Sequence, residues 1–212
     1  MQPIKVWGHF GPNPVKVFFV LEELGLPYEV KPVTFAEAKQ PEYLKVNPNG
    51  RVPAIEDPNT GLTLWESGAI VEYLVDKYDT EHKLSFPAGT DDYYHAKQWL
   101  HFQGTGQGPY FGQGMWFQKY HHEKLPSALE RYVKEINRVN QVLESQLTKN
   151  EWLVGNKLSF VDISFIAWEQ LVSQNIDGFN IPDYPHVKQW YDKIASRPAI
   201  KRIIDQQSQQ NK

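Results

Sequence analysis

The chain of 212 residues contains no cysteine. This absence excludes disulfide bonds, thiolate nucleophiles, zinc–thiolate sites and a CxxC redox motif carried by the protein itself. An excess of basic residues is also missing, because 22 Lys and Arg face 25 Asp and Glu, a formal net charge of −3. Proteins that bind nucleic acid present a strongly basic surface, so nucleic acid is not an expected partner.

Long apolar runs are absent too, since no stretch approaches the roughly 20 consecutive apolar residues of a membrane helix. Residues 1–5 have neither the charged nor the apolar region of a secretory signal, and none is expected. Hydrophobic residues make up 41% of the chain and aromatic residues 14%, which is enough for a core and too much for disorder. The composition predicts a soluble globular protein of the cytoplasm, with no membrane partner.

The periodicity of apolar residues divides the chain into an α/β part and an all-α part. The predicted strands are residues 4–7, 28–32, 52–55 and 62–65. Their order with the intervening helices, β-α-β-α-β-β-α, implies a parallel pair joined by a right-handed crossover and a closing antiparallel hairpin. Only helices are predicted further on, over residues 93–102, 125–147, 160–172 and 187–196. We therefore expect domains at 1–80 and 91–212 with a linker at 81–90, and a frayed Gln-rich tail at 206–210.

Asn13 stands between a predicted strand and a predicted helix, and between two prolines. A residue before proline avoids the α region, and proline fits the first helical position. One interpretation is that Asn13 caps the helix and Pro14 opens it. The other is that the Asn13 amide faces a ligand above the edge of the sheet.

Val52-Pro53 opens a predicted strand, where a proline does not interrupt the hydrogen-bonded ladder. If the bond between them is cis, the Val52 backbone can pair with an extended peptide. Only about 5–6% of X–Pro bonds are cis, so the base rate favours trans.

Glu66-Ser67 leads directly into another predicted helix, and Ser67 is a good N-cap. The free N–H groups of a helix start attract a carboxylate, and Glu66 could hold an ammonium group. The alternatives are a simple capped helix and a site for the zwitterionic end of an amino acid.

Three further patterns indicate structure more than chemistry. Ser159 and Asp162 have capping-box spacing, which predicts a folding signal. His121-His122-Glu123 reads as surface residues, because adjacent residues do not face one ligand on a helix. The glycines between residues 104 and 114 predict a bent or thinned helix that something approaches closely. The aromatic residues around them fit either a core or an apolar substrate pocket.

In this order, the motifs resemble those of cytosolic glutathione transferases, in particular the fungal relatives of the yeast nitrogen-catabolite regulator and the bacterial Nu class. The resemblance extends from Ile4 to about Arg202. It rests on residues 12–13 (PN), 47–54 (NPNGRVPA), 65–70 (WESGAI), 103–113 (QGTGQGPYFGQ), 130–132 (ERY) and 152–155 (WLVG).

The resemblance implies a thioredoxin-like N-terminal domain, an all-α C-terminal domain with the second-substrate pocket, a homodimer, glutathione as co-substrate and no metal. By position, Glu66 and Ser67 would hold the γ-glutamyl end of glutathione, and the Val52 backbone would pair with the cysteinyl residue beside a cis Pro53. Asn13 would lie by the sulfur. Arg51 is a candidate for a glutathione carboxylate, and Arg131 for a glutathione contact within the chain or across the dimer.

The chain departs from the relatives' pattern at two places. Relatives commonly have Thr where this chain has Gly11 and Gly where it has Pro14, so a hydroxyl near the sulfur is missing. A polar contact in the loop before residue 41 falls on Ala38, with Lys39 as the nearby substitute.

The implied chemistry starts from a glutathione thiolate stabilised by the Asn13 amide, while water or a glutathione carboxylate takes the proton. Conjugation to a small apolar electrophile and reduction of a disulfide or peroxide are the two enzymatic outcomes. A glutathione- or apolar-ligand-binding regulatory protein of the same fold, without turnover, is the third alternative.

Overall fold

A computed structural model describes residues 1–210 and divides into two compact units. The first comprises residues 1–85 and 196–212, and the second residues 86–195. The domain bounds 1–80 and 91–212, with a linker at 81–90, stay a prediction. Each unit is described by itself below.

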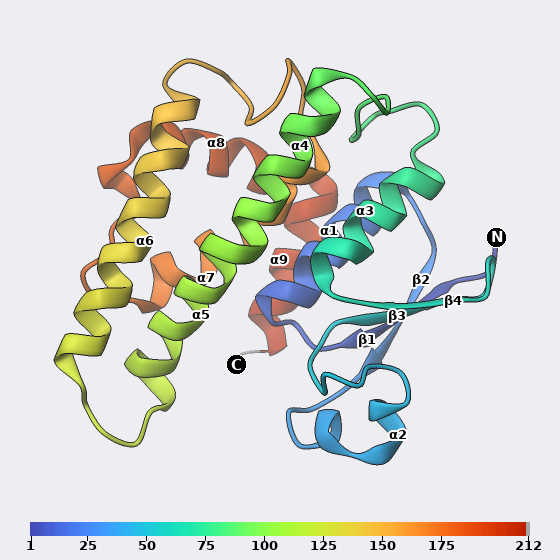
Figure 1. Ribbon diagram of the computed structural model, residues 1–212, viewed down its shortest axis with the longest axis horizontal. Helices are drawn as coiled ribbons and strands as arrows, with labels where there is room; N and C mark the ends of the chain where they lie inside the picture. Colours follow the sequence, from blue (N-terminus) through green and yellow to red (C-terminus); the bar gives the residue numbers. More distant parts are fainter. Residues whose placement is uncertain (211–212) are drawn as a thin grey trace. The chain divides into compact units, whose positions relative to one another are not determined.

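The first unit is built on a mixed four-stranded sheet with the strand order β2-β1-β3-β4 (Figure 1). Its strands are β1 (Ile4–Gly8), β2 (Tyr28–Pro32), β3 (Ala54–Asp57) and β4 (Leu62–Trp65). Its α-helices are α1 (Pro12–Leu24), α2 (Pro41–Leu44), α3 (Ser67–Tyr78) and α9 (Pro198–Gln210), with a short 3₁₀ turn at Glu37–Lys39. The predicted order of strands and helices up to α3 is confirmed.

The strand pairing confirms both connections expected from the sequence. β1 and β2 are parallel, whereas β3 is antiparallel to both β1 and β4. Trp7 lies opposite Ala54, and Ala54 lies opposite Trp65. The carboxyl ends of β1 and β4 and the start of β3 therefore meet at one end of the sheet.

Helix α1 is buried on all sides over its middle, with Pro14 to Leu21 all buried. It packs against α3 and against α9. The α9 helix was not predicted, and the expectation of a frayed tail at 206–210 is wrong. That segment is helical, and Gln207 is buried because its side chain bonds to the β1–α1 loop.

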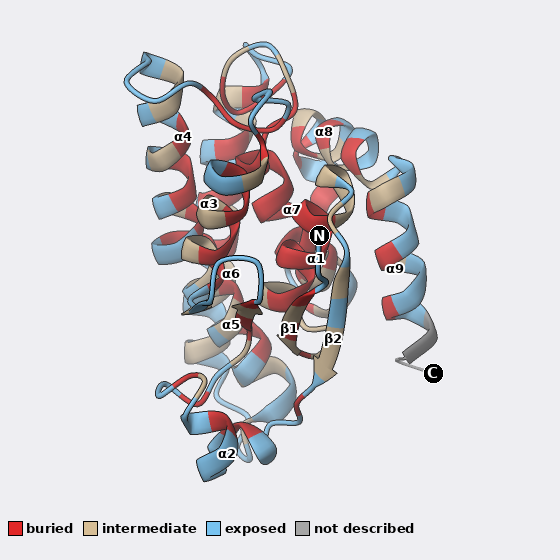
Figure 2. Cartoon of the chain, turned by 90° about the vertical axis from the view of Figure 1, so that its right-hand side faces the viewer, coloured by how far each residue is buried: buried red, intermediate tan, exposed pale blue. Residues whose placement is uncertain are grey.

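The second unit is entirely helical over its described residues. Its α-helices are α4 (Asp91–Phe102), α5 (Gly108–Met115), α6 (Pro126–Leu147), α7 (Phe160–Asn175) and α8 (Pro185–Ala195), with a 3₁₀ turn at Ile181–Asp183. Two π-helical segments, Gln103–Gln107 and Trp116–Tyr120, flank α5. All four predicted helices are present, and α7 is buried over most of its length (Figure 2).

The capping box predicted at the start of α7 is confirmed. Ser159 donates its backbone N–H to Asp162 Oδ2 at 2.9 Å. The other carboxylate oxygen of Asp162 accepts from the Leu153 N–H at 2.9 Å and from Trp190 Nε1 at 3.0 Å. This carboxylate therefore connects the start of α7 with α8, which is a folding role.

The glycines of α5 allow close packing, as predicted. A Cβ at Gly112 would lie 3.2 Å from Trp168 Cη2, and one at Gly114 would lie 3.0 Å from Ile136 Cδ1. The groups that approach here are side chains of the same unit. Among the neighbouring aromatic residues, Phe111 is fully buried, whereas Trp116 and Tyr120 are exposed, so the core interpretation holds for part of the set.

Candidate functional site

Three segments meet where β1 ends. A Cβ built on Gly8, the last residue of β1, would lie 3.1 Å from Pro14 Cβ and 3.7 Å from Val52 Cβ. Pro14 belongs to the first turn of α1, and Val52 precedes β3. The start of α1 and the Val52 segment thus both lie against the end of β1, and glycine at position 8 leaves room for this approach.

The N-cap interpretation of Asn13 is wrong. Helix α1 begins at Pro12, and its N-cap is Gly11, whose backbone is extended and whose carbonyl accepts from the Val15 N–H at 3.0 Å. The first N–H groups of a helix have no partner within the helix, so Pro12 and Pro14 both fit the first turn. Asn13 is the second helical residue and is half-buried.

The bond between Val52 and Pro53 is cis, so the base-rate expectation of a trans bond is wrong and the expectation from the resemblance is confirmed. Over residues 1–210, neither the backbone N–H nor the C=O of Val52 has a hydrogen-bond partner. The neighbouring Arg51 carbonyl is occupied, since it accepts from Tyr43 Oη at 2.7 Å and Asn47 Nδ2 at 2.6 Å. A firmly held loop therefore presents one backbone donor and one acceptor.

Two cationic side chains belong to this loop region. Arg51 is exposed. Lys39 donates from Nζ to the Gly50 carbonyl at 2.6 Å, and Ala38 beside it is buried. The ammonium of Lys39 therefore lies at the backbone of the residue that precedes Arg51.

The start of α3 has an uncommon backbone. Glu66 is the N-cap, with φ 72° and ψ 112°, and Ser67 is the first helical residue, so the N-cap interpretation of Ser67 is wrong. A positive φ at a residue other than glycine costs about 1–3 kcal/mol and is concentrated at functional sites. The Glu66 side chain is exposed, and it follows β4 at the sheet end described above.

The first turn of α3 is open to a ligand. In the part of the chain that the structure describes, no side-chain hydrogen bond caps this helix start, and a Cβ added to Gly68 would meet no atom within 4 Å. The Ser67 side chain is nearly buried at the same helix end. Free N–H groups at a helix start favour an anion.

A buried lysine is coupled electrostatically to this site. Lys16 on α1 is 2% exposed. Burial lowers the pKa of the Lys16 ammonium to about 7, while the negative charge of Glu66 acts in the opposite direction. Lysines are almost never fully buried without a reason, and the charge coupling to Glu66 connects this one to the candidate site.

The remaining candidates lie in the helical unit. Arg131 is an exposed residue of α6. A groove of about 370 Å³ is lined by Trp99 of α4 and by α6 residues that include Arg138 and Val142. His121, His122 and Glu123 offer ligand atoms within 4.8 Å of one another. His122 and Glu123 are exposed and His121 is half-buried, as expected for surface residues. None of the helices described in residues 1–210 is long and apolar enough to cross a membrane.

The sequence-based interpretation missed three residues near the site. Lys16 looks like one polar residue in an amphipathic helix, His9 has no motif around it, and Gln207 lies in a polar tail. Only His9 carried a usable signal, because it stands directly between the end of a strand and the Gly-Pro-Asn segment.

Two protein-family models match the chain. Residues 2–76 match the glutathione S-transferase N-terminal domain, and residues 109–198 match the C-terminal domain. The glutathione S-transferase-like protein gedE of Aspergillus terreus is 54% identical, covering 96% of this chain and 95% of that protein. The transcriptional regulator URE2 of Saccharomyces cerevisiae is 34% identical, covering 96% of this chain and 69% of its own length.

A solved structure extends the similarity to three dimensions. The glutathione transferase URE2P8 of Phanerochaete chrysosporium, determined with oxidized glutathione, superposes with a TM-score of 0.95 and 47% identity, covering 99% of this chain and 96% of that chain. The predicted fold, a thioredoxin-like domain followed by an all-α domain, is confirmed. The chain belongs to the glutathione S-transferase family, among the fungal proteins related to URE2.

Proposed function

We propose that this protein is a glutathione transferase that binds reduced glutathione at the end of its sheet and uses the thiolate. The observation that carries the proposal is that the segments bearing Asn13, Val52 and Glu66 lie at one end of the sheet. There Val52 presents a backbone donor and acceptor that have no partner among residues 1–210.

Each part of glutathione has a complementary group. The γ-glutamyl carboxylate binds the open first turn of α3 at Ser67, and the adjacent ammonium pairs with the exposed Glu66 carboxylate. The cysteinyl backbone pairs with Val52 as an added strand would. The glycyl carboxylate is attracted by Arg51, with Lys39 nearby.

Arg131 and Asn13 have different parts in the proposal. Arg131 stays a predicted glutathione contact, and an Arg131→Ala variant tests it by loss of affinity. Asn13 donates from its side-chain amide to the thiolate, which lowers the pKa of the thiol. An amide is no efficient base, so the proton passes to water or to a glutathione carboxylate.

Two reactions are open to the bound thiolate. In conjugation, the sulfur attacks an electrophilic carbon, displaces its leaving group with the bonding electron pair and forms a thioether. In reduction, it attacks a disulfide, forms a mixed disulfide and releases one substrate thiolate. A second glutathione thiolate then releases the other substrate thiolate and yields oxidized glutathione. Because the chain has no cysteine, glutathione supplies both electrons. The oxidized glutathione bound to URE2P8 supports the second reaction.

The alternative is a glutathione- or apolar-ligand-binding regulatory protein without turnover, which the similarity to a transcriptional regulator supports. Activity assays with several electrophiles and a small disulfide separate the two. We expect turnover that depends on glutathione. Tight glutathione binding with no turnover of any substrate would favour the regulatory function. We further propose a cytoplasmic homodimer, which sedimentation analysis tests.

A further inference from the structure

The imidazole of His9 carries a hydrogen-bond donor that the protein does not use. The Gly11 N–H donates to His9 Nδ1 at 2.9 Å. This bond requires an unprotonated Nδ1, so the proton of the neutral ring resides on Nε2. Nε2 is buried and has no hydrogen-bond partner among the described residues. Buried polar atoms are nearly always paired, so this donor points to an acceptor that is not part of the chain.

Gly11 provides the space for this ring. A Cβ at Gly11 would lie 2.6 Å from His9 Cε1 and 3.0 Å from His9 Nδ1. The backbone of Gly11 has φ −75°, which any residue adopts, so glycine is required for room and not for conformation. The imidazole thus occupies the volume that a side chain at position 11 would fill, two residues before Asn13.

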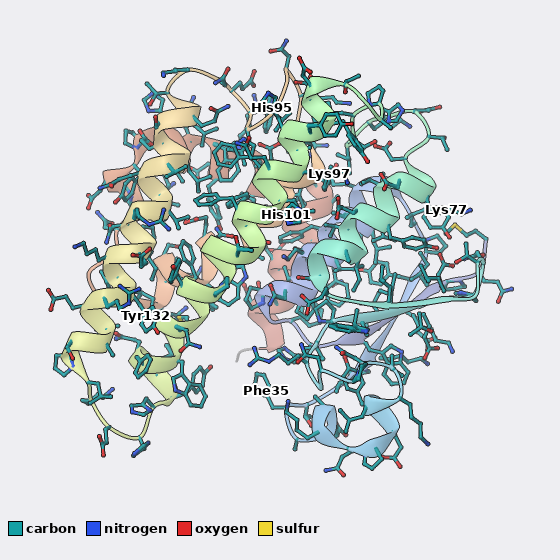
Figure 3. The ribbon with its side chains drawn as sticks, in the orientation of Figure 1. Phe35, Lys77, His95, Lys97, His101 and Tyr132 are labelled. Carbon is teal, nitrogen blue, oxygen red and sulfur yellow. The ribbon has the colours of Figure 1, made fainter. Side chains whose placement is uncertain are left out.

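The surroundings keep the ring neutral. The Phe35 ring stands edge-on against it, with the ring centroids 5.0 Å apart and the planes at 68°. Phe35 is itself 78% exposed on the segment after β2 (Figure 3). Burial lowers the pKa of His9, which preserves Nδ1 as an acceptor and Nε2 as a donor.

His9 lies next to the proposed glutathione site. It directly follows Gly8, the residue at which the first turn of α1 and the Val52 segment meet. Under the proposed function, on which this inference rests, the cysteinyl residue of glutathione pairs with Val52 and its sulfur lies near Asn13. We propose that His9 donates a hydrogen bond from Nε2 to the sulfur of bound glutathione and stabilises it as the thiolate.

No proton is transferred in this step. His9 keeps its Nε2 proton, and the thiol proton leaves as proposed for Asn13. A donor that bonds to the charged form lowers the pKa of the thiol. In this proposal His9 and Asn13, four residues apart in the chain, donate to the same sulfur atom.

The test is the pKa of the thiol of glutathione bound to the full-length protein, followed by the ultraviolet absorbance of the thiolate. In His9→Leu we expect this pKa to rise by about one unit, a roughly tenfold loss of thiolate below the pKa. The matched control is His95→Leu, since His95 is an exposed residue of α4 (Figure 3). The control is expected to keep the pKa of the wild type.

Two variants protect the test against misfolding of His9→Leu. Gly11→Ala retains the histidine but places a Cβ where the ring lies, so the same rise in thiol pKa is expected. The double variant His9→Leu with Gly11→Ser places a hydroxyl donor in that volume, and we expect it to recover part of the loss.

The possible failures are distinguishable. If the wild type binds glutathione and lowers its thiol pKa, but His9→Leu and Gly11→Ala do so equally, the role of His9 is wrong and the proposed function stands. If the wild type does not bind glutathione, the proposed function fails and the role of His9 fails with it.

Discussion

The side-chain amide of Gln207 donates a 2.7 Å hydrogen bond to the backbone carbonyl of Phe10. The two residues are 197 positions apart in the chain, and Gln207 is only 9% exposed. The last helix of the first unit thereby holds the loop that presents His9 and Asn13. A residue in an apparently featureless tail thus becomes a positioning residue for the candidate site.

We expect Gln207→Leu to loosen this loop. The substitution leaves the Phe10 carbonyl without its donor. A buried carbonyl without a partner typically costs about 1–3 kcal/mol of stability. Hydrogen exchange of residues 9–11 should accelerate, and turnover with glutathione should fall. The neighbouring Gln206 is exposed, so Gln206→Leu is the control. Equal exchange in the two variants would show that the bond has no effect on the loop.

Asn13→Ala should reduce catalysis more than glutathione binding. A hydrogen bond to a charged group contributes roughly 1.5–3 kcal/mol, so kcat should fall about tenfold to a hundredfold while the Kd of glutathione changes little. Steady-state kinetics and a binding titration measure the two effects separately. Unchanged kcat in the variant contradicts the role of Asn13.

Glu66→Gly should stabilise the fold and weaken the binding of glutathione. Glycine adopts φ 72° without steric cost, which relieves part of the roughly 1–3 kcal/mol held in this backbone. Loss of the carboxylate removes the partner of the γ-glutamyl ammonium. Thermal melts measure the gain in stability, and titrations measure the loss of glutathione affinity. Glu66→Gln is the variant that loses only the charge. If Glu66→Gly weakens glutathione binding but does not raise the Tm, the backbone of Glu66 is not strained.

The lowered pKa of Lys16 predicts that the stability of the fold depends on pH. Its folded pKa, about 7, lies below its ordinary value, so the cost of burying the ammonium is full below about pH 7. Between the folded and unfolded pKa values the unfolded chain binds more protons, and stability rises with pH. The difference in Tm between wild type and Lys16→Met should therefore shrink from pH 7 towards pH 10. A difference that is constant over this range argues against a buried charged amine.

Much of the fold follows from local patterns. Alternating apolar runs predicted β3 and β4, and Ser159 with Asp162 marked the start of α7, because these signals depend on neighbouring residues alone. Helix α9 escaped prediction because residues 205–210, its second half, are all polar and so carry no apolar periodicity.

The errors at the candidate site have a common cause. Asn13 and Ser67 are residue types that often cap helices, yet each lies inside its helix. A residue earlier in the chain takes the cap position, Gly11 in α1 and Glu66 in α3. The burial of Lys16 and the room for His9 depend on contacts between segments distant in sequence, or on the absence of a single Cβ. A local pattern does not show the burial of Lys16, and for His9 it shows only a position next to the end of a strand.

The central claim is that this chain binds reduced glutathione, and calorimetric titration of the full-length protein near neutral pH tests it most directly. We predict saturable heat with one glutathione per chain, weakened in Glu66→Gln. No heat up to millimolar glutathione, meaning a binding free energy weaker than about −4 kcal/mol, would contradict the claim.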